Sequence, residues 1–218
     1  MVATPIGNLE DITLRALRIL KEADVVACED TRVTKKLLSH FDIHTPTVSF
    51  HAHSGAKGFD KIVKLLGEGK LVALVSDAGT PGVSDPGLEL VSVVRERLPD
   101  IKIETIPGAS ALTAALAVAG LKCPSFIFYG FLPQKKGRET LLAEIAAGDR
   151  ASIFYESPHR IVKTLEALVK LAPERRMGLF RELTKIYEES LVGLPHQVLE
   201  KLTPEKQRGE FVVIVEGV

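Results

Sequence analysis

The residues with the clearest potential for chemistry follow a short apolar run at positions 71–75. Two carboxylates, Asp77 and Asp85, stand among glycines and prolines in the sequence SDAGTPGVSDPG. Glycine and proline at this density fit neither a helix nor a strand interior, so a rigid loop with exposed backbone is expected. The β-branched run before it predicts a buried strand, and Asp85 and Pro86 predict the N-cap and first residue of a helix. Strand, glycine-rich loop and helix form the arrangement in which α/β proteins bind ligands at the carboxyl edge of a sheet.

The charge of this loop indicates what it can bind. A phosphate-binding loop directs backbone N–H groups at the anion and usually carries a lysine. The loop here has no lysine, and both Asp77 and Asp85 would repel a phosphate. A nucleoside cofactor with cationic groups, such as S-adenosylmethionine, is the better match. The alternative is that the loop only connects two elements and that Asp85 only caps a helix.

The composition restricts the classes of protein that remain. The chain has 218 residues, of which 45% are hydrophobic, enough for one large or two small domains. Its formal net charge is zero, so an RNA site would be a local patch. Cys28 and Cys123 lack metal-ligand spacing, and His51 and His53 would point to opposite sides of an extended segment, so no metal site is expected. The chain has neither an apolar run of about 20 residues nor a basic and apolar leader, so we expect a cytoplasmic protein with no membrane partner.

Strands and helices alternate along the first half of the chain. After a short first strand, strands are expected at residues 25–28, 47–50, 71–75 and 102–106. Helices are expected near residues 12–23, at 33–40 and 59–66, from 85 onward and at 111–119. This alternation predicts a parallel sheet covered on both faces, in an α/β domain of residues 1–118.

The second half, residues 119–218, predicts another α/β domain. Strands are expected at residues 125–131, 151–155, 177–180, 190–192 and 211–215, and helices at 139–147, 161–171 and 195–202. Helical connections become rarer toward the end of the chain. A mixed sheet is therefore expected here rather than a fully parallel one.

Polar residues follow several of the expected strands. Asp30 and Ser110 could each belong to a site, or each could only cap the helix that follows it. The loop after residue 131 carries Lys135, Lys136 and Arg138 beside an aromatic residue, a combination that fits contacts to an RNA backbone. A solvated basic loop is the alternative.

Several stretches of the sequence resemble one family. They are VATPIGNLEDITLRAL near the start, CEDTR at 28–32, SDAGTPGVSDPG at 76–87, IPGASALTAAL at 106–116, YGFLP at 129–133, YESPHR at 155–160, RELTKIYEE at 181–189 and the closing GEFVVIVEG. Over essentially its whole length, the chain is similar to the ribosomal RNA small-subunit methyltransferase I family of the tetrapyrrole methylase superfamily. Members of that family usually begin a few residues earlier and continue beyond the final strand.

The resemblance implies a fold, a reaction and a binding site. The fold is two α/β domains with S-adenosylmethionine in the cleft between them, usually in a homodimer. The reaction is 2′-O-methylation of the ribose of a decoding-centre cytidine in 16S ribosomal RNA, with the 30S subunit as the expected partner. The cofactor residues implied by the matching motifs are Pro5, Ile6, Asp77, Ala78, Gly79, Thr80, Pro81, Ser84, Ser110 and Ala111, together with Tyr155, Glu156, Leu183 and Thr184.

Catalytic and RNA-binding residues are expected at other strand ends. Glu182 and Lys185 are the candidates for a general base or a stabilising cation at the ribose hydroxyl, and simple ion pairing is the alternative. The candidates for phosphate contacts are Arg32, Lys135, Lys136, Arg138 and Arg160.

Two other functions fit parts of the sequence. A tetrapyrrole C-methyltransferase, acting on a corrin or porphyrin precursor, would share the cofactor site but need a broad apolar trough. A non-catalytic nucleotide-binding module would use the glycine-rich loop as a sensor. Binding of the cofactor without turnover on RNA would support the second of these.

Overall fold

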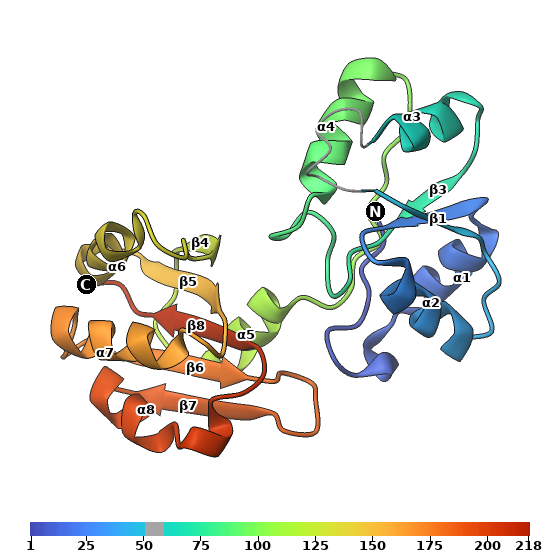
Figure 1. The fold of residues 1–218 in the computed structure, drawn as a ribbon. Helices are drawn as coiled ribbons and strands as arrows, with labels where there is room; N and C mark the ends of the chain where they lie inside the picture. Colours follow the sequence, from blue (N-terminus) through green and yellow to red (C-terminus); the bar gives the residue numbers. More distant parts are fainter. Residues whose placement is uncertain (51–58) are drawn as a thin grey trace. The chain divides into compact units, whose positions relative to one another are not determined.

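The computed structural model describes residues 1–50 and 59–218. His51 and His53, which were not expected to bind one metal ion together, lie outside the described residues. Contacts within the chain divide it into two compact units, Met1–Ser110 and Ala111–Val218 (Figure 1). Helix α5 (Ala111–Ala119) was expected in the first domain, but it contacts two strands of the second unit and belongs with that unit.

The described part of the first unit alternates strands and helices as expected. Its elements are η1 (Leu9–Asp11), α1 (Leu14–Glu22), β1 (Val25–Cys28), α2 (Thr31–His40), β2 (Thr47–Ser49), α3 (Asp60–Gly67), β3 (Val72–Leu74) and α4 (Gly87–Arg97). Hydroxyl and carboxylate oxygens cap two of the helices. The Thr13 side chain accepts a hydrogen bond from the N–H of Ala16 at the start of α1, and Asp30 accepts one from Arg32 at the start of α2.

The strands of the first unit form a parallel sheet in the order β2-β1-β3 within the described residues. Successive residues of β1 face opposite sides of this sheet. Val26 packs in a cluster with Leu20 of α1 and Leu38 of α2. Ala27 packs in another cluster, with Ile62 of α3. Helices therefore cover both faces, and the strand is apolar throughout because all four of its residues are buried.

The segment expected to form a strand at residues 102–106 forms no ladder. Only Ile106 pairs, in a parallel bridge with Val2. The N–H of Ile106 donates to the carbonyl of Met1 at 2.8 Å, and the N–H of Val2 donates to that of Leu74 at 2.8 Å. The expectation was wrong because strand hydrogen bonds need a neighbour, and the N-terminal residues reach only the end of the segment.

The second unit contains a mixed sheet with helices between its strands. Its elements are α5, β4 (Phe126–Phe131), α6 (Arg138–Ala147), β5 (Ala151–Glu156), α7 (Ile161–Leu171), β6 (Met177–Arg181), β7 (Glu189–Gly193), α8 (Pro195–Lys201), η3 (Pro204–Lys206) and β8 (Phe211–Val215). The strand order is β4-β5-β8-β6-β7. Strands β4 and β5 are parallel, whereas β8 is antiparallel to β5 and β6, and β6 is antiparallel to β7. A parallel sheet in the first unit and a mixed sheet in the second were both expected, and both are confirmed.

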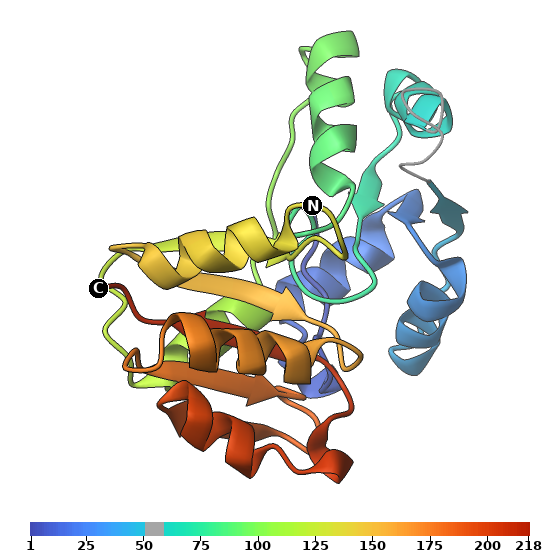
Figure 2. The same ribbon diagram turned by 60° about the vertical axis from the view of Figure 1, so that its left-hand side comes forward.

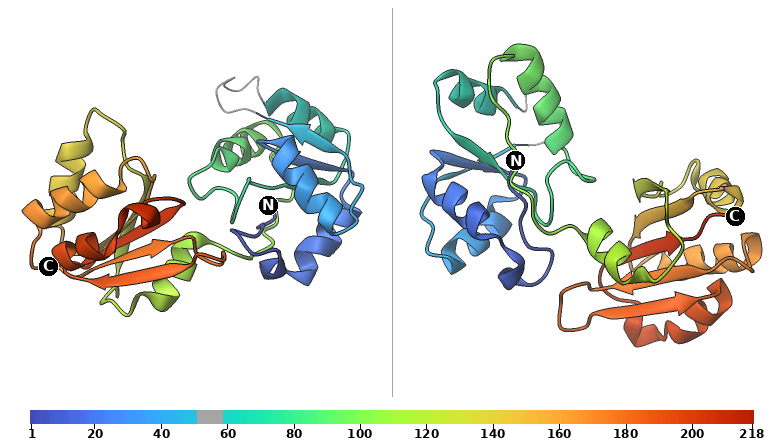
Figure 3. Two further views of the ribbon diagram at one scale, coloured as in Figure 1. Left: turned by 60° about the horizontal axis from the view of Figure 1, so that its bottom comes forward. Right: turned by 180° about the vertical axis from the view of Figure 1, so that it is seen from behind.

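Helices cover both faces of the second sheet. Helices α6, α7 and α8 lie on one face and α5 on the other (Figures 2 and 3). Ile145 of α6, Leu165 of α7 and Val198 of α8 belong to one buried cluster, which also contains Phe154 of β5 and Val213 of β8. Strand β8 is buried at every residue because it lies in the middle of the sheet with covered faces.

Two kinds of feature are absent from the described residues. No described helix is long and apolar enough to cross a bilayer. No group of three or more histidine, cysteine, aspartate or glutamate side chains within residues 1–50 and 59–218 is arranged to hold a metal ion.

Candidate functional site

The glycine-rich loop after β3 is tied to the N-terminal segment. The N–H of Thr4 donates to the carbonyl of Gly79 at 2.9 Å, and the N–H of Gly79 donates to the carbonyl of Thr4 at 3.1 Å. The Ser76 hydroxyl donates to the carbonyl of Gly79 at 3.2 Å, and the Thr4 hydroxyl donates to the carbonyl of Ser76 at 3.3 Å. Buried hydroxyls and backbone groups thus fix the path of the loop.

Gly79 lies where three segments of the first unit meet. Its φ is +83°, a conformation that favours glycine. A Cβ at this position would lie 3.2 Å from Cγ2 of Ile6 and 3.6 Å from the carbonyl oxygen of Ala109. The Thr80 hydroxyl donates to the same carbonyl at 3.0 Å. Ile6, Gly79 and Thr80, which were expected to bind the cofactor, therefore lie close together, and their cofactor role stays a prediction.

Carboxylates gather at this edge of the sheet. The N–H of Asp30, just after β1, donates to Oδ1 of Asp77 at 3.2 Å. Burial raises the pKa of the neighbouring Glu29, and the charges of Asp77 and Asp85 raise it further. These carboxylates repel anions and attract cations. The sulfonium and ammonium groups of S-adenosylmethionine therefore fit these residues. A Cβ at Gly79 would crowd the Ile6 side chain, so the loop backbone passes close to Ile6.

Asp85 closes the loop and also accepts a hydrogen bond from the first residue of the helix that it was expected to cap. Its Oδ1 accepts hydrogen bonds from the N–H groups of Gly82 at 2.8 Å and Gly87 at 2.7 Å. Helix α4 begins at Gly87, and Pro86 is its cap residue, so the predicted start was one residue early. The carboxylate spans the turn because Ser84, with a φ of 66°, bends the chain back on itself.

The remaining expected cofactor residues of the first unit differ in burial. Pro5, Ile6 and Pro81 are buried, Thr80 and Ser110 are half-buried, and Asp77, Ala78 and Ser84 are at least partly exposed. Ala111, expected to act beside Ser110, is the first residue of α5 and of the second unit. The polar side chains at this edge are therefore accessible, whereas the proline and isoleucine side chains beside them are buried.

Arg32, expected to bind phosphate, forms an ion pair within its own turn. Its Nη2 lies 2.7 Å from Oδ2 of Asp30. The Arg32 side chain and its backbone N–H hold the pKa of Asp30 down at about 2. The guanidinium itself remains exposed.

The second unit brings three strand ends to one edge. Strands β4 and β5 run parallel, and β6 runs in the same direction because β8 is antiparallel to both β5 and β6. Phe131, Glu156 and Arg181 are the last residues of β4, β5 and β6. Phe211, the first residue of β8, pairs with both Glu156 and Arg181. The expected site residues of this half thus follow strands that end together.

A buried carboxylate holds the loops of this edge. The Glu156 side chain is inaccessible to solvent, and its Oε2 lies 2.5 Å from Nη2 of Arg138. Its Oε1 lies 2.8 Å from Nε of Arg160 and accepts the N–H of Ser157 at 2.8 Å. The Thr164 hydroxyl donates to Oε2 at 2.9 Å. We call Glu156, Arg138, Arg160 and Thr164 the buried ion cluster.

The buried ion cluster changes the interpretation of three expected site residues. Arg138 and Arg160, expected to bind phosphate, have side chains only 13% and 19% exposed. Nη1 of Arg138 donates to the carbonyl of Pro133 at 3.1 Å, and Nη1 of Arg160 donates to that of Leu132 at 3.2 Å. Glu156, expected at the cofactor or substrate, is used within the protein. Buried charges need such partners, so these side chains shape the loop after β4, while Lys135 and Lys136 in that loop are exposed.

Glu182 and Lys185 form a paired group at the end of β6. Nζ of Lys185 lies 2.9 Å from Oε1 of Glu182 and 2.9 Å from Oε2 of Glu210. Burial alone would raise the pKa of Glu182, but hydrogen bonds from Lys185 and the Glu210 N–H outweigh it, and the net shift is downward. Burial would lower the pKa of Lys185, but its two carboxylate partners raise it overall. Both groups are therefore held in their charged forms.

The other expected residues of this half are Leu183, Thr184 and Tyr155. Leu183 is buried, and Thr184 has a φ of 67°. The N–H of Thr184 donates to Oε2 of Glu188 at 2.5 Å. The Tyr155 ring contacts the rings of Phe128 and Phe131.

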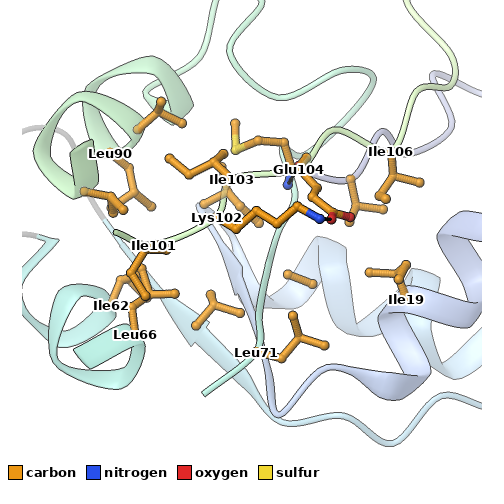
Figure 4. A pocket seen from close by; sticks show the side chains of 17 residues that line it. Ile19, Ile62, Leu66, Leu71, Leu90, Ile101, Lys102, Ile103, Glu104 and Ile106 are labelled. Carbon is orange, nitrogen blue, oxygen red and sulfur yellow. Dashed lines mark hydrogen bonds and ion pairs between the residues drawn. The ribbon is translucent and has the colours of Figure 1, made fainter. Parts of the chain in front are cut away.

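The first unit also contains a cavity away from the expected site residues. It has a volume of about 310 Å³ and is lined mainly by apolar side chains, including Ile62 of α3, Leu90 of α4 and Ile103 (Figure 4). Lys102 and Glu104 at this cavity form an ion pair with each other. None of the expected site residues lines it.

Two features of these edges went unrecognised in the sequence. Glu29 was noted only as part of a polar strand end, yet the pKa of its carboxyl is raised by burial and by the charges of Asp77 and Asp85. Phe131 was noted only as a neighbour of the basic loop, yet it is 58% exposed. A carboxylate directly after a buried strand was the available signal for Glu29.

The sequence and the fold match a known group of enzymes. The family described as Tetrapyrrole (Corrin/Porphyrin) Methylases matches residues 1–198. The chain belongs to the tetrapyrrole methylase family. It is accordingly a methyltransferase that uses S-adenosylmethionine, which confirms the expected cofactor.

Two relatives show which members of this family the chain is similar to. The chain is 50% identical over 219 residues to ribosomal RNA small subunit methyltransferase I of Halalkalibacterium halodurans, covering 100% of this chain and 75% of that protein. It is 42% identical over 217 residues to the protein of the same name from Thermotoga maritima, covering 100% of this chain and 97% of that protein. The predicted family resemblance is confirmed.

Solved structures support the fold. A cobalt precorrin-4 methyltransferase, CbiF, aligns with a TM-score of 0.69 at 17% identity, covering 99% of this chain and 92% of that one. The methyltransferase CobJ aligns with a TM-score of 0.69 at 23% identity, covering 97% and 90%. At such identities the likeness concerns the fold alone.

Proposed function

We propose that this protein transfers a methyl group from S-adenosylmethionine to the ribose 2′-oxygen of a decoding-centre cytidine in 16S ribosomal RNA. The observation that carries the proposal is the 50% identity, over the whole chain, to a relative named ribosomal RNA small subunit methyltransferase I. The substrate in this proposal is the 30S subunit, and the protein acts in the cytoplasm as a homodimer.

The cofactor in this proposal binds at the acidic edge of the first unit. Its binding surface consists of Pro5, Ile6 and the loop from Asp77 to Pro81, because these segments meet around Gly79. The carboxylates of Glu29 and Asp77 complement positive charge. When bound, S-adenosylmethionine supplies an electrophilic methyl group whose transfer breaks a carbon–sulfur bond, forms a carbon–oxygen bond and releases the hydroxyl proton.

The second unit in this proposal binds the RNA. Lys135 and Lys136 contact phosphates, and the buried ion cluster keeps their loop in one conformation. Arg32 adds a phosphate contact from the first unit. Most of the acceleration comes from holding the reactants in line, which requires such fixed loops.

Glu182 and Lys185 stabilise charge near the ribose in this proposal. Lys185 keeps its proton because its pKa is raised, so it favours negative charge on the 2′-oxygen. The lowered pKa of Glu182 makes it a weak base. We therefore assign the pair an electrostatic role and leave the hydroxyl proton to solvent.

The test combines cofactor binding with a chemical readout. Calorimetric titration with S-adenosylmethionine and S-adenosylhomocysteine, with the wild type and Asp77→Asn, is expected to give binding that weakens in the variant. Incubation with 30S subunits from a strain lacking this methylation, followed by digestion to nucleosides and mass spectrometry, is expected to give 2′-O-methylcytidine. Methylation of a base, or of a corrin or porphyrin precursor instead, would overturn the assigned substrate. Cofactor binding without turnover would favour the sensor.

A further inference from the structure

An aromatic ring stands exposed at the RNA-facing edge proposed for the second unit. Phe131 ends β4 and is 58% exposed. Its ring centroid lies 5.4 Å from that of Tyr155 at an interplanar angle of 63°. Tyr155 in turn lies 5.0 Å from Phe128 at 71°. Edge-to-face contacts of this kind are favourable, so the Phe131 ring has a firm aromatic support.

The backbone beside Phe131 is held in place. The next carbonyls, of Leu132 and Pro133, accept hydrogen bonds from Arg160 and Arg138 at 3.2 Å and 3.1 Å. Both guanidinium groups bind the buried Glu156. Leu132 itself is 2% exposed and anchors the loop in the core. A ring mounted in this way loses little conformational entropy when a ligand stacks on it.

Charge near the ring points to an anionic partner. Lys135 and Lys136 follow in the same loop and are exposed. Proteins that bind single-stranded nucleic acid combine cations for the backbone with aromatic rings on which bases stack. A purely apolar partner would gain nothing from the two lysines.

We propose that Phe131 is a stacking site for an unpaired base of the RNA substrate, with Lys135 and Lys136 on the adjacent phosphates. The inference rests on the proposed RNA substrate, and it adds to that proposal a residue that binds one nucleotide by stacking on its base. Stacking does not read the identity of a base, because every base has a π-face. The site therefore fixes the position of the strand.

The chain contains no tryptophan, which permits a direct test. In Phe131→Trp, the only indole of the protein stands at the proposed site, and a stacked base quenches its fluorescence. Titration with a short oligocytidine RNA and with 30S subunits is expected to quench it. The matched control is Phe126→Trp, at the opposite end of the same strand, where the residue is 40% exposed and no quenching is expected.

A second pair of variants tests affinity. Phe131→Leu is expected to weaken RNA binding by about tenfold, whereas Phe131→Tyr keeps it, because only the latter retains a ring. Affinity for S-adenosylmethionine is expected to stay unchanged in both. Circular dichroism and thermal unfolding confirm that each variant folds.

Three outcomes would overturn the inference. They are equal quenching of both tryptophans by RNA, quenching at position 131 by S-adenosylmethionine alone, and wild-type RNA affinity in Phe131→Leu. The second outcome would assign the ring to the cofactor adenine. Failure of the proposed function is separate, because it appears as the absence of 2′-O-methylcytidine with the wild-type protein, whether or not RNA quenches the fluorescence.

Discussion

The carboxyl edges of the two sheets carry opposite chemistry. In the first unit, backbone groups and the carboxylates of Glu29 and Asp77 follow the strands. In the second unit, the buried carboxylate of Glu156 is paired with two arginines, and the lysines of the loop after β4 and the Phe131 ring are exposed. Both edges lie at the same place in an α/β fold, where ligands bind. The same architecture can therefore suit a cationic cofactor at one edge and an anionic polymer at the other.

Removing the buried carboxylate should have the largest effect. Glu156→Ala leaves two arginines without their partner, so we expect a loss of about 3–5 kcal/mol in unfolding free energy. Urea unfolding measures it. The control is Glu210→Ala, whose side chain is 77% exposed and whose ion pair with Lys185 should contribute about 1 kcal/mol or less. Equal losses in the two variants would show that the buried ion cluster does not hold the second edge.

Crowding the first edge should have the next largest effect. Gly79→Ala and Gly69→Ala both place a side chain at positive φ, which costs about 1–2 kcal/mol. Only Gly79 also meets Ile6, at 3.2 Å, whereas nothing lies within 4 Å of a Cβ at Gly69. We expect Gly79→Ala to be the less stable and to lose cofactor affinity, while Gly69→Ala keeps it. Calorimetric titration and urea unfolding distinguish the two variants. Wild-type cofactor affinity in Gly79→Ala would contradict the cofactor-binding surface proposed around Gly79.

Charge removal at the second edge should alter the salt dependence of RNA binding. In Lys135→Gln/Lys136→Gln, the slope of log affinity against log salt concentration should fall by about 1.4, since each phosphate contact on a single strand contributes about 0.7. Fluorescence anisotropy with labelled RNA over a salt series measures the slope. The double variant Lys122→Gln/Lys170→Gln, with lysines before β4 and at the end of α7, should keep the wild-type slope. A change in cofactor affinity in either variant would argue against separate roles for the edges.

The smallest effect concerns protonation of the first edge. The folded pKa of Asp30 is about 2, below the 3.8 of an unperturbed aspartate. Its ionised form therefore stabilises the fold above about pH 4, and this contribution is lost as the pH falls toward 2. In Arg32→Gln, the carboxyl titration followed by NMR should move up toward 3.8, and in Arg32→Lys it should move part of the way. An unchanged midpoint in Arg32→Gln would exclude the ion pair as its cause.

Much of the fold could be predicted because its pattern is local. Strand β1 at Val25–Cys28 and strand β8 at Phe211–Val215 were placed residue for residue, since buried runs of β-branched residues leave few alternatives. The segment at residues 102–106, which alternates polar and β-branched residues, was also expected to be a strand and is not one. Its hydrogen bonds depend on a neighbour distant in sequence, which periodicity does not report.

The candidate site was predictable in part. Motif matches collected Ile6, Gly79 and Thr80, which the structure brings together. They also assigned Arg138 and Arg160 to RNA, whereas both arginines bind buried Glu156. A charged residue in a loop looks the same in sequence whether it faces solvent or a buried carboxylate.

Glycine, proline and apolar spacing act over a few residues, so the sequence indicated two α/β units and the loop that bends at Gly79, while the family was indicated by its matching motifs. Which charges remain available depends on the tertiary structure. Glu156 pairs with two arginines inside the second unit, and Phe131 stands exposed at the end of β4, just before the loop that these arginines hold. The physical reason is that burial and ion pairing depend on residues brought together from distant parts of the chain, and it is these contacts that set the charge each edge presents.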